Sequence, residues 1–220
     1  MERQTTVMVV DDERDVCDCV AQVVGTLNVA VRCFTTGREV LEFCTPDLPG
    51  CLLLDMQITD MSGLDVREQM VARHCFQPFI MLSGRSDIAC AVEAMHLGAR
   101  DFLQKPFDRK RLLDSVQDAL AWDAAERARR AEEDDVLERV NTLTARERQV
   151  LQLVGAGRIT KQIARDLTIS PKTVEVHRSN IMRKMHVDSA AELLHLVARH
   201  PRVSSDQLTT RGYELRAVGG

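Results

Sequence analysis

The chain has 220 residues, of which 45% are hydrophobic and 28% charged, values that are ordinary for a soluble protein of one or two domains. No apolar run approaches the roughly 18 residues of a membrane span, and the polar start Met1-Glu2-Arg3-Gln4 lacks a signal-peptide pattern. We therefore expect a cytoplasmic protein that makes no use of a membrane.

The first 120 residues alternate short apolar runs with amphipathic stretches. The apolar runs predict strands at 6–10, 29–34, 51–54, 79–82 and 101–103. The stretches between and after them predict helices at 14–26, 37–44, 63–74, 86–97 and 108–122. Strands separated by helices of roughly 10 to 15 residues imply right-handed crossovers. The prediction for this half is therefore an α/β domain with a five-stranded, doubly wound parallel sheet.

All seven cysteines lie in this half, without a CxxC pair or metal-ligand spacing, at positions 17, 19, 33, 44, 51, 75 and 90. We interpret them as reduced side chains that pack as small hydrophobic groups. A redox-sensing role is the alternative.

Polar residues follow several of the predicted strands at the point where each strand ends. They are Asp11 and Asp12, Asp55, Ser83, and Lys105. A single acid at a strand end is usually a helix cap or a solvated loop residue, but ligands of open α/β sheets bind at this edge. Three carboxylates gathered there would repel one another unless a cation joined them, and oxygen ligands suit Mg²⁺.

Five motifs occur in sequential order: Val9-Val10-Asp11-Asp12-Glu13, Leu53-Leu54-Asp55, Met61-Ser62-Gly63-Leu64, Met81-Leu82-Ser83-Gly84 and Asp101-Phe102-Leu103-Gln104-Lys105-Pro106-Phe107. Together they resemble the receiver domain of two-component response regulators, over nearly all of residues 5–120. The resemblance implies the strand order 2-1-3-4-5. It also implies a cis peptide bond between Lys105 and Pro106.

The resemblance assigns a role to each residue at this edge of the sheet. Asp55 would be the nucleophile that accepts a phosphoryl group from a sensor histidine kinase. Mg²⁺ would be held by Asp11, Asp12, Asp55 and the backbone carbonyl of Gln57. Lys105 would pair with the phosphate.

Two further residues would form a switch that responds to the phosphate. The Ser83 hydroxyl would turn toward the phosphate, and Phe102 would then pack inward. Ser83 could instead simply cap the following helix, and Phe102 could be a core residue in either case. Thr59 stands where most relatives have proline, so we expect the loop after Asp55 to be less rigid. Gln57 and Arg85 occupy positions that vary in the family.

Residues 121–140 are rich in alanine, glutamate and arginine and contain neither glycine nor proline. That composition predicts a solvated helical linker, for which a dimer contact or a relay is the alternative role. Charge is unevenly spread along the chain, with a net charge of −7 over residues 1–120, −3 over the linker, +5 over 141–200 and +1 over the tail. A basic module within an acidic chain suggests that this module contacts nucleic acid.

Residues 141–200 predict a compact all-α domain of four helices, at 148–155, 161–167, 171–185 and 193–200. Thr144 with Glu147, and Ser189 with Glu192, have the spacing of capping boxes. On the third helix, a core-facing side is predicted to consist of Val174, His177, Ile181 and Met185. His177 is more plausible there as a packed side chain than as a metal ligand. The helix and the short helix before it form a helix-turn-helix candidate.

The motifs Leu143-Thr144-x-Arg146-Glu147-Arg148, Lys161-x-Ile163-Ala164 and Lys172-Thr173-Val174-x-x-His177 resemble the LuxR-type DNA-binding domain. The whole chain is similar to NarL/FixJ-type response regulators, closest to the FixJ branch. On DNA, base edges would be read by Glu175, Val176 and Ser179, and phosphates would be contacted by Lys172, Thr173, Arg178 and Arg183. The resemblance places the dimer surface on the last helix, at Ala190, Leu193, Leu194 and Val197.

Relatives commonly carry glycine where this chain has Thr168. Because a β-branched residue disfavours positive φ, we expect the turn to adjust. The tail, 201–220, contains no motif.

The sequence thus predicts a transcriptional regulator, not an enzyme, whose phosphorylation on Asp55 promotes homodimerisation and binding to double-stranded promoter DNA. One alternative is a receiver whose DNA binding is controlled independently of phosphorylation. The other is a phosphatase with an aspartyl-phosphate intermediate, although no second acid stands next to Asp55.

Overall fold

The computed structural model describes residues 4–84 and 88–200, which form two compact units divided after Ala128. Arg85 and the tail lie outside the described residues. Within the described residues, no helix is both long enough and apolar enough to cross a membrane.

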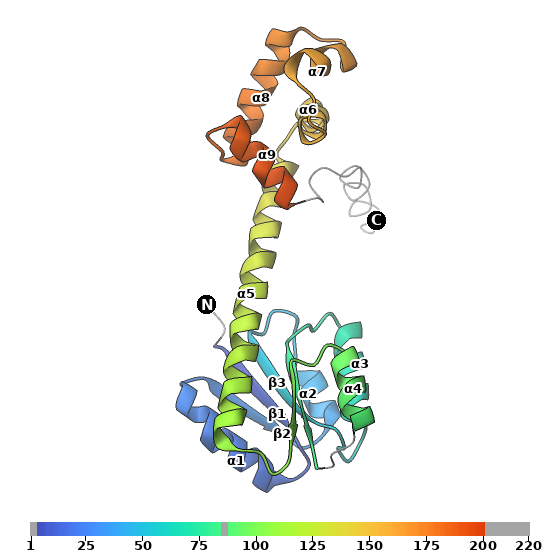
Figure 1. Cartoon of the computed structure of the whole chain (residues 1–220), viewed down its shortest axis with the longest axis vertical. Coiled ribbons are helices and arrows are strands. Elements are labelled where there is room, and N and C mark those ends of the chain that lie inside the picture. The colour runs from blue at the N-terminus through green and yellow to red at the C-terminus, as the bar shows by residue number, and fades with distance from the viewer. Residues whose placement is uncertain (1–3, 85–87, 201–220) are drawn as a thin grey trace, which may run out of the picture. The chain divides into compact units, whose positions relative to one another are not determined.

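The first unit is built on a parallel sheet of five strands in the order β2-β1-β3-β4-β5 (Figure 1). The strands are β1 (Thr6–Val10), β2 (Ala30–Phe34), β3 (Gly50–Asp55), β4 (Phe79–Ser83) and β5 (Asp101–Gln104). β1, β3 and β4 are buried along their whole length, as expected for strands covered on both faces. The predicted fold class and strand order are confirmed.

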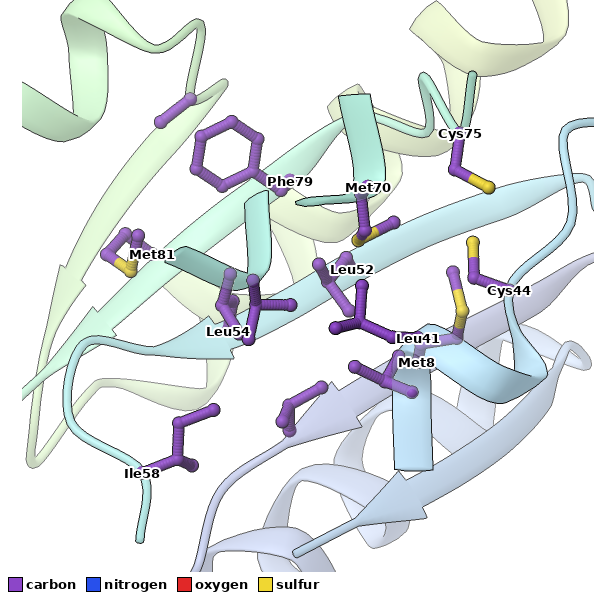
Figure 2. Packing of buried hydrophobic residues seen from close by; sticks show 14 of the residues in the cluster. Met8, Leu41, Cys44, Leu52, Leu54, Ile58, Met70, Cys75, Phe79 and Met81 are labelled. Atoms are coloured by element: carbon purple, nitrogen blue, oxygen red, sulfur yellow. The ribbon is translucent and has the colours of Figure 1, made fainter. Parts of the chain in front are cut away.

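The helices of this unit cover both faces of the sheet. They are α1 (Arg14–Val24), α2 (Gly37–Phe43), α3 (Gly63–Ala72), α4 (Ile88–His96) and α5 (Arg109–Asn141), with a short 3₁₀ turn, η1 (Gly25–Leu27), after α1. One face packs against α2, α3 and α4 through Met8, Leu52, Leu54, Met70 and Phe79 (Figure 2). The other face packs against α1 and α5. Alternate residues of each strand thus enter two separate cores.

The cysteines behave as small core side chains in most cases. Cys17, Cys44, Cys51 and Cys75 are buried, and no disulfide joins the cysteines whose side chains the structure describes. Burial raises the pKa of the Cys17 thiol and of the Cys44 thiol to about 12. Thiols with such a high pKa are poor nucleophiles, which favours the packing role for these two residues, whereas Cys19 and Cys33 are exposed.

Helix α5 has 33 residues and runs without a break through the expected last helix of the first domain and the expected linker, so the prediction that the linker is helical is confirmed. Two of its side chains hold the loop before β3. The buried Asp123 accepts the backbone N–H of Gly50 at 2.9 Å, and Arg127 donates to the carbonyl of Asp47 at 2.9 Å. These contacts extend the first unit beyond residue 120.

The second unit is all-helical, as predicted. Besides the last part of α5 it contains α6 (Ala145–Gly155), α7 (Thr160–Asp166), α8 (Pro171–Met185) and α9 (Ala190–Arg199). Its core includes Val140 of α5, Leu151, Ile163, Ile181 and Leu193.

Two capping predictions have different outcomes. The capping box of Thr144 and Glu147 is present in full. At α9, Ser189 accepts from the Glu192 amide, but the Glu192 carboxylate accepts from the amide of Asp188 rather than that of Ser189. The second box is therefore shifted by one residue.

The expectation that the turn at Thr168 adjusts is wrong. Thr168 adopts the left-handed conformation, with φ of 54°. Its amide donates to the carbonyl of Arg165, and the next amide, of Ile169, donates to that of Ala164. This pattern ends α7 in the way that a glycine would, so the threonine carries the strain.

Candidate functional sites: an acidic cluster and an exposed helix face

The acidic cluster lies where β1 and β3 end side by side. Val10 is paired with Leu54, so the residues that follow them, Asp11 and Asp55, are adjacent. Ligand oxygens of Asp11, Asp12 and Asp55 all lie within 4.8 Å of one another. Asp11 is fully buried and Asp55 is 7% exposed, whereas Asp12 is exposed to solvent. The structure therefore brings together the three acids that the sequence singled out.

Lys105 enters the cluster from the end of β5. Its Nζ lies 2.6 Å from Asp11 Oδ2 and 3.0 Å from Asp55 Oδ2. The Lys105 amide donates to the carbonyl of Ser83 at 2.7 Å, and the following bond to Pro106 is cis, as predicted. Backbone geometry at the ends of β4 and β5 thus directs the ammonium onto two of the three carboxylates.

Burial and the contacts with Lys105 have opposing effects on the pKa values in the cluster. Burial raises the pKa of Asp11 above its usual value, although the Lys105 ammonium and the Glu13 amide oppose the rise. Burial alone would lower the pKa of Lys105, but its contacts with Asp11 and Asp55 outweigh that effect and raise it. The ammonium therefore stays charged and compensates part of the negative charge.

The donor set fits a divalent cation such as Mg²⁺. Three carboxylates from the ends of two neighbouring strands supply oxygen ligands within a small volume. Asp11 Oδ2 is buried and, apart from the nearby ammonium, has no hydrogen-bond donor of ordinary geometry among the described residues. Gln57 is exposed two residues after Asp55 and forms an isolated bridge with Ser62.

The loop between β3 and α3 contributes contacts that the sequence did not reveal. Thr59 Oγ1 donates to Asp12 Oδ2 at 3.0 Å. The Asp60 carboxylate accepts the first two amides of α2, from Gly37 at 2.8 Å and Arg38 at 3.1 Å. Although burial opposes it, these amides lower the pKa of Asp60. No local pattern could have indicated contacts between residues so far apart in the sequence.

The two proposed switch residues lie on neighbouring strands. Ser83 ends β4 and is 5% exposed, next to Gln104 of β5. Phe102 is paired with Met81 and is half-buried against the core formed with α2, α3 and α4. The backbone also links Ser83 to Lys105, because the Ser83 carbonyl accepts the Lys105 amide.

Helix α8 presents the side chains predicted to reach DNA. Ser170 caps it by accepting the Thr173 amide, and Pro171 stands in its first turn. Six of the seven predicted contact residues are exposed, and Arg178 is half-buried. Val176 is 53% exposed. Val174, Ile181 and Met185 are buried as predicted, whereas His177 is only half-buried, so the prediction that it faces the core is correct only in part.

The predicted dimer surface on α9 needs correction. Leu193 is fully buried and Val197 is 4% exposed, and both belong to the core of their own unit. They cannot also form an outer surface, because their side chains are buried in that core. Leu194 is 41% exposed and Ala190 is half-buried, so these two remain available to a partner.

Comparison with known proteins finds a match for each of the two units. Residues 7–117 match the response regulator receiver domain, and residues 141–197 match the luxR family of bacterial regulatory proteins. The response regulator protein TodT of Pseudomonas putida is 36% identical over 198 residues, covering 90% of this chain and 87% of that protein. The transcriptional regulatory protein FixJ of Rhizobium meliloti is 37% identical over 191 residues, covering 87% and 94%.

Two solved structures extend the likeness to both units. The response regulator StyR is 39% identical, with a TM-score of 0.79 over 90% of this chain and 100% of that one. Full-length FixJ from B. japonicum is 34% identical, with a TM-score of 0.55 over 90% and 98%.

Proposed function

This chain belongs to the response regulators that join a receiver domain to a LuxR-type DNA-binding domain, and on that premise we propose that Asp55 is its phosphoryl acceptor. The observation that carries the proposal is the contact of Lys105 with both Asp11 and Asp55, beside the exposed Asp12. The donor is a phosphohistidine of a sensor histidine kinase in the cytoplasm.

In the proposed reaction, a carboxylate oxygen of Asp55 attacks phosphorus. The bond between phosphorus and the donor's imidazole nitrogen breaks, and an acyl phosphate forms on Asp55. Asp11, Asp12, Asp55 and the carbonyl of Gln57 would hold Mg²⁺, which would supply positive charge to the phosphoryl oxygens. Lys105 is already 3.0 Å from the Asp55 carboxylate, so a small movement lets it pair with the phosphate.

The response follows from the charge that the phosphate adds. The Ser83 hydroxyl turns toward the phosphate, and Phe102, which is half-buried, moves further inward. This change favours a homodimer, to which Ala190 and Leu194 contribute, and two copies of α8 then bind inverted half-sites in promoter DNA.

Phosphoryl uptake from acetyl phosphate with Mg²⁺ tests the first step. The wild-type chain is expected to gain the mass of one phosphoryl group, and Asp55→Asn to gain none. Asp47→Asn is the matched control, because Asp47 is exposed and lies in the loop before β3. Equal uptake by Asp55→Asn and the wild type would exclude Asp55 as the acceptor.

Binding of the phosphorylated chain to a pool of random DNA sequences tests the second step. Lys172→Ala is expected to weaken binding to all sequences alike and to reduce the dependence on salt by about one phosphate contact. Glu175→Ala is expected to relax the preference at one base pair, since glutamate accepts from a cytosine amino group. If both variants weaken all sequences equally, Glu175 does not read a base.

A further inference from the structure

Asp12 differs from the other two acids in what holds it. Asp11 and Asp55 both contact the Lys105 ammonium, whereas no ion pair to Asp12 is present among the described residues. Its side chain is exposed, and its neighbours in the cluster carry the same charge. Repulsion and solvation together favour a rotamer in which the Asp12 carboxylate leaves the cluster.

The Thr59 hydroxyl opposes that departure. Its Oγ1 donates to Asp12 Oδ2 at 3.0 Å, across 47 positions of sequence. This hydrogen bond occupies one carboxylate oxygen of Asp12 and leaves the other oxygen available to a cation. A donor that contacts a ligand carboxylate in this way also fixes its orientation.

Thr59 is itself held in place by the loop around it. The next residue, Asp60, is fixed by the amides of Gly37 and Arg38 at the start of α2. At the loop's ends, the Gly63 amide donates to the carbonyl of Met56 at 2.9 Å, and Gln57 is bridged to Ser62. The hydroxyl is therefore presented from a fixed backbone, and the expected loss of rigidity at Thr59 is offset by Asp60.

We infer that Thr59 is a positioning residue that keeps the Asp12 carboxylate in the acidic cluster and so sets the affinity of the site for Mg²⁺. The inference rests on the proposed function, because it takes the cluster to be the Mg²⁺ site. It assigns the role to the hydroxyl of residue 59 and not to the stiffness of the backbone.

The test is a titration of the full-length chain with MgCl₂, followed by NMR of backbone amides in the loop and at Lys105. Thr59→Val keeps the shape of the side chain but removes the donor, and is expected to weaken Mg²⁺ binding about tenfold. Thr59→Ser keeps the donor and is expected to stay within about twofold of the wild type. Thr26→Val is the control, because Thr26 lies in η1 and its hydroxyl bonds the carbonyl of Val23.

Thr59→Pro separates the hydroxyl from rigidity, since it stiffens the loop without supplying a donor. Weakened binding, as in Thr59→Val, supports the inference, and wild-type affinity overturns it in favour of backbone stiffness. Wild-type affinity in Thr59→Val overturns it as well. The same spectra show whether each variant is folded.

Failure of the wider proposal looks different in the same experiment. If the wild type shows no saturable response to MgCl₂, or if Asp12→Asn responds as the wild type does, the cluster is not the Mg²⁺ site. If the wild type binds, Asp12→Asn does not, and Thr59→Val binds normally, only the role of Thr59 is wrong.

Discussion

The acidic cluster and the exposed face of α8 are built in opposite ways. The cluster depends on side chains at the carboxyl ends of β1, β3 and β5, and inside it Lys105 contacts Asp11 at 2.6 Å and Asp55 at 3.0 Å. The exposed face of α8 belongs to a single helix. The buried residues of α8 attach the helix to its unit, and most of its predicted DNA-contact residues are exposed to solvent. A site assembled across the sheet should be sensitive to single changes, whereas a site on one helix should tolerate them.

The largest effect on stability is expected for Lys105→Met. It removes the cation that pairs with the fully buried Asp11, and an uncompensated buried charge costs about 3 kcal/mol. Urea unfolding measured through Trp122 reports on this unit, because Trp122 is the chain's one tryptophan and contacts Arg100. Lys110→Met, on the exposed start of α5, is the control. An unchanged unfolding free energy for Lys105→Met would show that the ion pair does not stabilise the sheet edge.

Gly63→Ala should come next. A Cβ at this position would lie 2.2 Å from the carbonyl oxygen of Asp55, so the backbone that carries the acceptor must move. We expect a loss of about 2 kcal/mol and slower phosphoryl uptake. Gly25→Ala is the matched control, because nothing lies within 4 Å of its Cβ. Normal phosphoryl uptake by Gly63→Ala would mean that the cluster tolerates a shift of β3. That result would contradict the expectation that a site assembled across the sheet is sensitive to single changes.

In the second unit, Glu147 should show a smaller effect that depends on pH. Burial acts to raise the pKa of Glu147, but the Lys184 ammonium at 2.7 Å and the Thr144 amide outweigh it and hold that pKa below its ordinary value. A carboxyl whose pKa is lowered by folding stabilises above its unfolded pKa, and the contribution disappears as the pH falls.

Glu147→Gln is therefore expected to destabilise this unit by about 1 kcal/mol at neutral pH, and the deficit should shrink below about pH 4.5. Hydrogen exchange of amides in α6 and α8 measures this unit separately from the first. Glu138→Gln, at an exposed position of α5, should show no such change with pH. A deficit that stays constant down to pH 3 would contradict the assignment to the charged carboxylate.

Thr168→Gly should stabilise the same unit by about 0.5 to 1 kcal/mol, because glycine adopts φ of 54° without strain. Thr160→Gly, in the first turn of α7, should do the opposite, since glycine costs free energy in a regular helix. Hydrogen exchange in α7 and α8 measures both. Destabilisation by Thr168→Gly would show that its side chain contributes more than the strain costs.

The smallest effect is expected for Val176→Ala. The side chain is 53% exposed, so its removal should change the unfolding free energy by less than about 0.5 kcal/mol while it weakens binding to preferred DNA. Comparing thermal unfolding with DNA affinity for this variant measures how far the binding face is independent of the fold. A large loss of stability would remove the contrast between the two sites.

The residues themselves explain how much of this could be predicted from sequence. Strand ends were predictable because apolar runs stop at a charge, as at Asp55, and parallel strands bring those charges to one edge. The contacts of Thr59 with Asp12 and of Asp60 with α2 were not, because both join segments far apart in sequence. Leu193 and Val197 were assigned to the dimer surface through the family resemblance, and the sequence could not correct this, because the apolar side of an amphipathic helix looks the same whether it faces its own core or a partner.

The hydrogen bonds that α5 makes with Gly50 and Asp47 matter when the first unit is produced as a separate fragment. A fragment cut at residue 120 would lose the carboxylate of Asp123, and the buried amide of Gly50 would then have no acceptor. A buried amide without an acceptor costs about 1 to 3 kcal/mol, so the shortened receiver would have a lower free energy of unfolding. A boundary drawn after Ala128 keeps both Asp123 and Arg127, and with them the anchor of the strand that ends in Asp55.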